Sequence, residues 1–117
     1  MEKVSGGAYP ILRTNKELAL SVESDGFSVS SEQLSAGTRD AAYLCLRLAL
    51  MERLFRDELP PLLLDESLCQ LDDKRASGAL TALASFGDSA QCLLFTCHTR
   101  EERLCRELGI EFERIKL

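Results

Sequence analysis

The sequence predicts a single α/β domain: an antiparallel β-meander, then a long helix, then a β-α-β-α-β unit with parallel strands. Three observations carry this prediction. Apolar and polar residues alternate through residues 11–30, apolar residues recur at steps of three and four over 38–56, and two short apolar runs lie at 62–64 and 91–96. Strands that are joined through a helix by short connections are parallel, and their crossover is right-handed.

The N-terminal residues are expected to comprise a lead-in and the meander. Residues 1–10 include Ser5-Gly6-Gly7, a flexible combination, so this segment is expected to fray. Thr14-Asn15 marks a first turn, and Asp25-Gly26 is a hairpin signal between two alternating runs. The meander is therefore expected to have three strands.

Residues 31–117 are expected to contain the long helix and the parallel unit. Pro60 and Pro61 interrupt the helix, and Gly87 and Gly109 follow two further helical patterns as terminating glycines do. The expected elements in order are a helix over 38–56, a strand over 62–64, a helix over 73–86, a strand over 91–96, a helix over 99–108 and a final edge strand over 110–117.

The composition is that of a globular domain with an acidic balance. The chain has 117 residues, of which 45% are hydrophobic and 28% charged, and a formal net charge of −5. Its 14 basic residues are scattered among 19 acidic ones. This argues against a broad nucleic-acid-binding face in this segment, because phosphate contact needs clustered Lys and Arg.

The sequence also points to a compartment. No apolar run approaches the roughly 20 residues of a membrane-spanning helix, and the first ten residues lack the apolar core of a signal peptide. We therefore expect a cytoplasmic protein with no membrane partner. The five cysteines are odd in number and lie mostly among apolar residues, which predicts reduced thiols rather than a disulfide framework.

A thiol-based metal site is the alternative use of the cysteines. It would have to combine Cys92, Cys97, His98 and Cys105, whose spacing contains no tight ligand pair. Cys97 and His98 would also point to opposite faces if a strand ran through them. The sequence therefore disfavours such a site.

Residues with ionisable side chains follow both apolar strands. Asp65 and Glu66 leave the first, and His98, the only histidine, leaves the second. Parallel strands bring these groups to one edge of the sheet, where ligands of such folds gather. Asp65 suits Mg²⁺, and Glu66 suits the orientation of an attacking water. The simpler alternatives are that Asp65 and Glu66 cap the following turn and that His98 is a hydrogen-bonded structural residue.

Small residues mark the start of the long helix. In Leu34-Ser35-Ala36-Gly37-Thr38, outward N–H groups of the helix N-terminus could meet an anion. The simpler alternative is an ordinary N-cap, in which Ser35 or Thr38 satisfies those donors. Asp72 likewise has a simple alternative role, the N-cap of the helix that begins near Asp73.

Taken in order, these pieces resemble the C-terminal lobe of an ABC-type ATPase head. Residues 34–37 are similar to the signature motif, 61–66 to the Walker B strand, 67–72 to the D-loop and His98 to the switch histidine. Each motif is weak alone, but the ordered combination is specific. The resemblance covers nearly the whole chain and is greatest to the SMC-like group, which includes SbcC- and RecN-type DNA repair ATPases.

The resemblance implies ATP and Mg²⁺ as cofactors and two sets of site residues. In one nucleotide site Asp65 would be the metal ligand, and Glu66 and His98 would be catalytic. A second set, Ser35, Ala36 and Gly37, would contact the γ-phosphate of ATP held by an opposing head, while Asp72 would couple the two sites. The implied partners are the N-terminal Walker A lobe of the same protein, a second head in a homodimer, and DNA.

The chain departs from the group in one major respect. No G-x-x-x-x-G-K-[ST] occurs in it, and Ala36 stands where Gly is common. We therefore expect a single C-terminal lobe, residues 1–117, that lacks the Walker A lobe and the coiled coil and has no ATPase activity alone. The alternatives are a degenerate, non-hydrolysing module that binds a partner, and the ATPase subunit of an ABC transporter.

Overall fold

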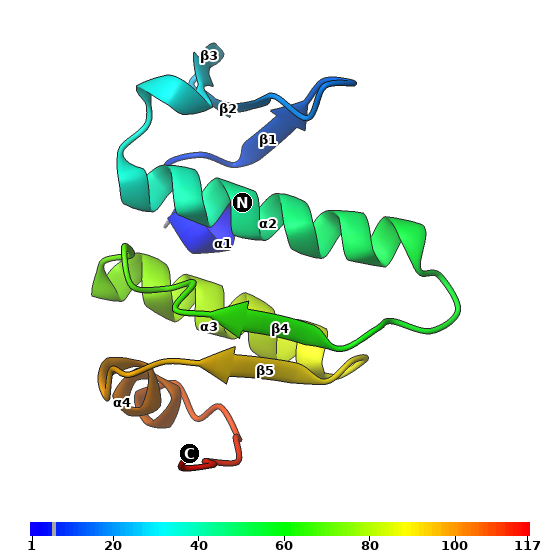
Figure 1. Cartoon of the computed structure of the whole chain (residues 1–117). Helices are drawn as coiled ribbons and strands as arrows, with labels where there is room; N and C mark the ends of the chain where they lie inside the picture. The colour runs from blue at the N-terminus through cyan, green and yellow to red at the C-terminus, as the bar shows by residue number, and fades with distance from the viewer. Residues whose placement is uncertain (6) are drawn as a thin grey trace.

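The computed structural model describes residues 1–5 and 7–117. Figure 1 shows the order of the elements along the chain. The helices are α1 (Glu2–Ser5), η1 (Ser31–Gln33, a 3₁₀ turn), α2 (Ala36–Leu54), α3 (Asp73–Gly87) and α4 (Arg100–Glu107). The strands are β1 (Ile11–Thr14), β2 (Leu20–Ser24), β3 (Phe27–Ser30), β4 (Leu62–Asp65) and β5 (Cys92–Phe95).

The strands form two separate sheets, which confirms the mixed α/β prediction. Strands β1, β2 and β3 are antiparallel in that order, whereas β4 and β5 pair in parallel with Leu62 opposite Cys92 and Asp65 opposite Phe95. The predicted hairpin turn is present, with positive φ at both Asp25 (50°) and Gly26 (82°). Helix α3 provides the crossover between the parallel strands.

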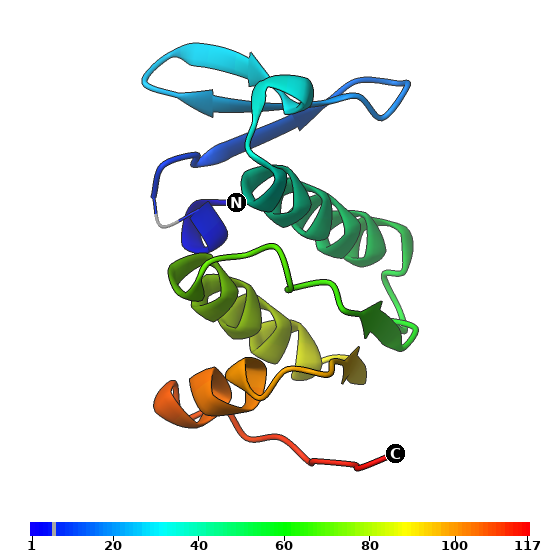
Figure 2. The same ribbon diagram turned by 60° about the vertical axis from the view of Figure 1, so that its left-hand side comes forward.

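Helix α2 lies between the two sheets and contributes to both cores (Figure 2). Ala42 packs with Leu20 and Val22 of the antiparallel sheet. From other positions on the same helix, Leu44 and Leu48 pack into the larger core, which includes Leu62 and Leu64 of β4, Leu80 and Leu83 of α3 and Leu104 of α4. Opposite faces of one helix therefore join the two sheets, as three- and four-residue spacing requires.

The expected frayed lead-in is wrong for the first residues. Residues 2–5 form α1, in which Val4 is 2% exposed and Ser5 6% exposed. The helix lies against α3 at Gly78, where a Cβ would overlap the carbonyl of Lys3. A helix this short is unstable in isolation, so its order comes from this packing. The expected flexible link Ser5-Gly6-Gly7 includes Gly6, which lies outside the described residues.

The expected edge strand over 110–117 is also wrong. These residues have no regular structure, and within the described part of the chain β5 pairs with β4 alone. Alternation favours a strand, but a strand needs a partner for its backbone hydrogen bonds. Residues 110–115 instead border a groove beside β5.

In the described residues, none of the helices combines the length and the apolar character that crossing a bilayer requires.

Candidate nucleotide site

The candidate site lies where β4 and β5 end. Figure 1 shows that both strands point to the same side of the molecule and that α2 and α3 begin on that side. Loop 66–72 follows β4, and loop 96–99 follows β5. Helix N-termini carry partial positive charge, so this edge suits an anionic ligand.

Glu66 has an unusual backbone conformation and a well-ordered carboxylate. Its φ is 45°, in the left-handed region that costs a non-glycine residue about 1–2 kcal/mol. The Cys97 amide donates to Glu66 Oε1 at 2.7 Å, and Thr96 Oγ1 donates to Oε2 at 3.3 Å. His98 Nε2 lies 3.8 Å from Oε2. The structure therefore brings Glu66 and His98 together, as the parallel topology predicts.

These contacts change the acidity of two groups. Hydrogen bonds from the Cys97 main chain and side chain hold the pKa of Glu66 below its ordinary value. In return, the Glu66 carboxylate raises the pKa of the Cys97 thiol. Glu66 is therefore ionised and Cys97 is a thiol at neutral pH, so the carboxylate is in the form that accepts hydrogen bonds.

Asp65 is the last residue of β4 and is exposed. Its main-chain oxygen accepts a hydrogen bond from Ser67 Oγ at 3.2 Å. Within residues 1–5 and 7–117 its carboxylate accepts no hydrogen bond, so both oxygens are accessible. An accessible carboxylate next to the site fits Mg²⁺, which binds oxygen and keeps several waters.

Arg100 of α4 holds the loop after β4. Its guanidinium donates to the carbonyls of Leu68 and Leu71, each at 2.7 Å. The same guanidinium pairs with Glu101, which is only 3% exposed, at 2.8 Å. One side chain thus satisfies two loop carbonyls and a buried carboxylate.

Thr96 connects that pair to Glu66. Its hydroxyl lies 3.3 Å from Glu101 Oε2 as well as 3.3 Å from Glu66 Oε2, and it accepts from the His98 amide at 3.1 Å. A hydroxyl has one proton, so it donates to one carboxylate at a time. Arg100, Glu101, Thr96 and Glu66 form a continuous polar chain between the two loops.

The small residues at the start of α2 cap the helix and also lie close to the loop after β4. Ser35 Oγ accepts from the Thr38 amide at 3.3 Å, as the simpler alternative predicted. A Cβ on Gly37 would lie 2.6 Å from the carbonyl oxygen of Gln70. The glycine is therefore required by the loop after β4, whereas Ser35 and Ala36 remain exposed.

Asp72 ends that loop as the N-cap of α3. Its Oδ1 accepts from the Arg75 amide at 2.8 Å, and its carboxylate pairs with the Arg75 side chain. Hydrogen bonding to the Arg75 amide lowers the pKa of Asp72. The predicted capping role is confirmed.

The structure does not join all predicted site residues. Glu66 and His98 are in contact distance and Asp65 precedes them, but Gly37 contacts Gln70 and Leu71 in the neighbouring loop rather than the carboxylates. Sequence reasoning missed Thr96, Arg100 and Glu101. It considered Cys97, which stands directly before His98, only as part of a disfavoured thiol-based metal site.

Comparison with known proteins supports the fold. No protein-family model and no curated protein sequence matches the chain. A solved structure from work on the structural biochemistry of ATP-driven dimerization and DNA stimulated activation of SMC ATPases does match, with a TM-score of 0.67 and 16% sequence identity. The match covers 87% of this chain and 67% of that one.

The chain has an SMC-like ATPase fold. The resemblance to SMC-like ATPases that the four motifs indicated is therefore confirmed at the level of the fold. At this identity the match carries no assignment of individual SMC-like site residues, and their roles rest on the geometry described above.

Proposed function

We propose that the chain is the C-terminal lobe of an SMC-like head that binds and hydrolyses ATP. The observation that carries the proposal is the meeting of ionised Glu66 and His98 at the carboxyl ends of β4 and β5. A carboxylate in this position can orient and deprotonate a water for attack on a phosphate. His98 is exposed and adjacent, so it can contact the γ-phosphate that the water attacks.

Asp65 would hold Mg²⁺ through its accessible oxygens. Bound Mg²⁺ would supply charge neutralisation of the nucleotide phosphates. The exposed Ser35 and Ala36, with Gly37, would face the nucleotide of an opposing head through the N-terminus of α2. Asp72 would couple the two sites, because it joins the loop after β4 to α3.

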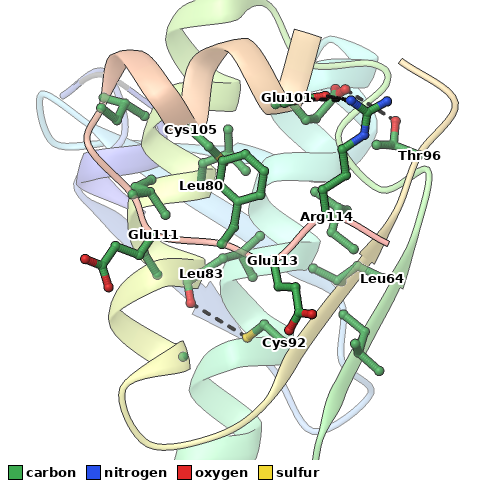
Figure 3. Close-up of a pocket in the computed structure, with 18 of the residues that line it drawn as sticks. Leu64, Leu80, Leu83, Cys92, Thr96, Glu101, Cys105, Glu111, Glu113 and Arg114 are labelled. Carbon is green, nitrogen blue, oxygen red and sulfur yellow. Dashed lines mark hydrogen bonds and ion pairs between the residues drawn. The ribbon is translucent and has the colours of Figure 1, made fainter. Parts of the chain in front are cut away.

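A groove beside β5 is where we propose that the N-terminal Walker A lobe binds. The groove has a volume of about 990 Å³ and lies between α3, β5 and the C-terminal residues (Figure 3). Leu80, Leu83 and Leu94 line it, with Phe112 and Ile115. A strand inserted here would pair with β5 and would also give the alternating residues 110–117 the partner they lack.

The other elements of the proposal concern the intact protein. Two heads would close around ATP as a homodimer and open after hydrolysis, and the head would act on DNA in repair or chromosome maintenance. We place the protein in the cytoplasm, which agrees with five free cysteines.

The chain alone should bind ATP weakly and should not hydrolyse it. The phosphate-binding loop with its Lys, which supplies most contacts to the triphosphate, does not occur in the sequence. Calorimetry with ATP and Mg²⁺, together with a phosphate-release assay, would measure this. Micromolar binding with turnover by the purified chain would contradict it.

The catalytic assignment is tested with the Walker A lobe supplied as a separate chain. Glu66→Gln should retain ATP-dependent dimerisation, seen by light scattering, and lose about 10²–10⁴-fold in turnover because the general base is removed. Ser35→Arg should abolish dimerisation while nucleotide still binds. Glu17→Gln, in the loop between β1 and β2, is the control and should change neither. Wild-type turnover by Glu66→Gln would refute the assignment.

A further inference from the structure

Three metal-binding side chains meet at the edge of the parallel pair. Ligand atoms of Glu66, Cys97 and His98 all lie within 4.8 Å of one another. The three residues come from two loops, since Glu66 follows β4 whereas Cys97 and His98 follow β5. This combination of an oxygen, a sulfur and a nitrogen ligand is distinct from the exposed oxygens of Asp65.

One of the two sequence arguments against a thiol-based metal site does not apply, because β5 ends early. Cys97 and His98 would point to opposite faces only if a strand ran through them, and β5 ends at Phe95. The His98 amide instead donates to Thr96 Oγ1 at 3.1 Å, which bends the chain there. The bend turns the Cys97 and His98 side chains toward the same carboxylate.

We propose that Glu66, Cys97 and His98 bind a divalent transition-metal ion of the Zn²⁺ class. Such ions take Cys, His and carboxylate ligands in a tetrahedron, and three protein ligands leave a fourth position for water. Cys97 would lose its proton to solvent on binding, and the thiolate and the Glu66 carboxylate would then balance the charge of the ion.

The geometry needs only a small adjustment. Bond lengths of 2.0–2.3 Å in a tetrahedral zinc site place ligand atoms about 3.5 Å apart. The Glu66 carboxylate is already held by the Cys97 amide at 2.7 Å, and His98 Nε2 is 3.8 Å from it. The side chain of His98 is 53% exposed and can rotate inward.

The site has a regulatory consequence, which rests on the proposed function. A metal ion on Glu66 would occupy the carboxylate that orients water for hydrolysis. Zn²⁺ would therefore inhibit turnover while Mg²⁺ at Asp65 would not. The bound ion would therefore be an inhibitor that acts directly on the catalytic carboxylate.

Metal binding is tested directly on the purified chain with Co²⁺ as the probe. We expect a thiolate-to-cobalt charge-transfer band and the intense visible bands of a tetrahedral ion, and Zn²⁺ should displace them. Cys97→Ser should remove the charge-transfer band, and His98→Gln should weaken binding by more than about 10-fold, the loss found even for residues that only orient metal ligands. Cys69→Ser changes the other exposed cysteine, which lies in the loop after β4 but outside the ligand cluster, and is the matched control.

The outcomes separate this proposal from the proposed function. A charge-transfer band that persists in Cys97→Ser, or octahedral Co²⁺ without such a band, overturns the metal site. With the Walker A lobe supplied, Zn²⁺ should inhibit the wild type and spare Cys97→Ser. A tetrahedral spectrum without any ATPase activity would leave the metal site standing and refute the proposed function, and normal turnover without metal binding would do the reverse.

Discussion

The antiparallel sheet and the parallel pair differ in the range of the contacts that order their loops. In the sheet, Asn15 Oδ1 accepts from the amides of Glu17 and Ala19, each at 2.9 Å, and Asp25-Gly26 closes the hairpin. In the parallel pair, loops 66–72 and 96–99 make local contacts of their own, such as the His98 amide to Thr96 Oγ1. They are also joined to each other and to α4 by hydrogen bonds between residues 29 to 32 positions apart. One region is therefore ordered by its own turns, whereas the other also depends on tertiary contacts.

Because of this difference, the effects of substitutions on the unfolding free energy should be additive in one region and coupled in the other. Local turns affect only their own hairpin, so changes there should be additive with distant ones. Arg100, Glu101, Thr96 and Glu66 form one network, so changes within it should be strongly coupled.

The largest effect is expected for Arg100→Ala. The change leaves two loop carbonyls without their donor and Glu101 buried without its partner, so unfolding free energy should fall by about 3–5 kcal/mol. The matched control is Arg13→Ala, which removes an exposed pair with Glu23 and should leave the urea midpoint unchanged within error. Equal midpoint shifts in the two variants would show that the two regions do not differ.

An intermediate effect is expected for Gly37→Ala. The added methyl group would lie 2.6 Å from the Gln70 carbonyl, and overpacking against backbone should cost about 1–3 kcal/mol. Gly87→Ala, in the last turn of α3, meets nothing within 4 Å and should instead stabilise by about 0.4–1 kcal/mol. Thermal unfolding of both variants checks the opposite signs, and stabilisation by Gly37→Ala would disprove the close contact.

The smallest effect is expected at Asp72. Asp72→Ala should cost about 1 kcal/mol through loss of the α3 cap, whereas Asp72→Asn retains a capping oxygen. The pKa of Asp72 is lowered from 3.8, so its ionic contribution is present above that pH and is lost as pH falls through the lower folded value. Urea titrations across this range should show the wild type losing its advantage over Asp72→Asn; a constant difference would contradict the pKa shift.

The sequence predicted what depends on local pattern and short connections. Alternation, glycines and prolines located the meander, the three longer helices α2, α3 and α4, and both parallel strands. The short crossover brought Glu66 and His98 to one edge. It also gave the Asp72 cap, because capping depends on residues three positions apart.

The rest depended on contacts that no local pattern records. The order of α1 comes from packing at Gly78. Residues 110–117 have strand alternation, but the part of the chain that the structure describes offers them no strand to pair with. Arg100 is an ordinary surface residue by sequence, and only the fold places it between two loops. Cys97 was considered only with Cys92, His98 and Cys105, whereas the fold places it beside Glu66, because β5 ends two residues before it.

Among residues 1–5 and 7–117, β5 has a strand partner on one edge only, so its other edge is open to two competing association reactions. An open edge beside exposed apolar side chains, such as Phe95 at 42% exposure, can pair with any extended chain, including a second copy. The rate of self-association grows with the square of the concentration of this chain, whereas the rate of binding to a partner grows with the product of the two concentrations. Under the proposed function the partner is the N-terminal lobe. At equal rate constants, an excess of that lobe, or synthesis of the two together, would then favour assembly over aggregation.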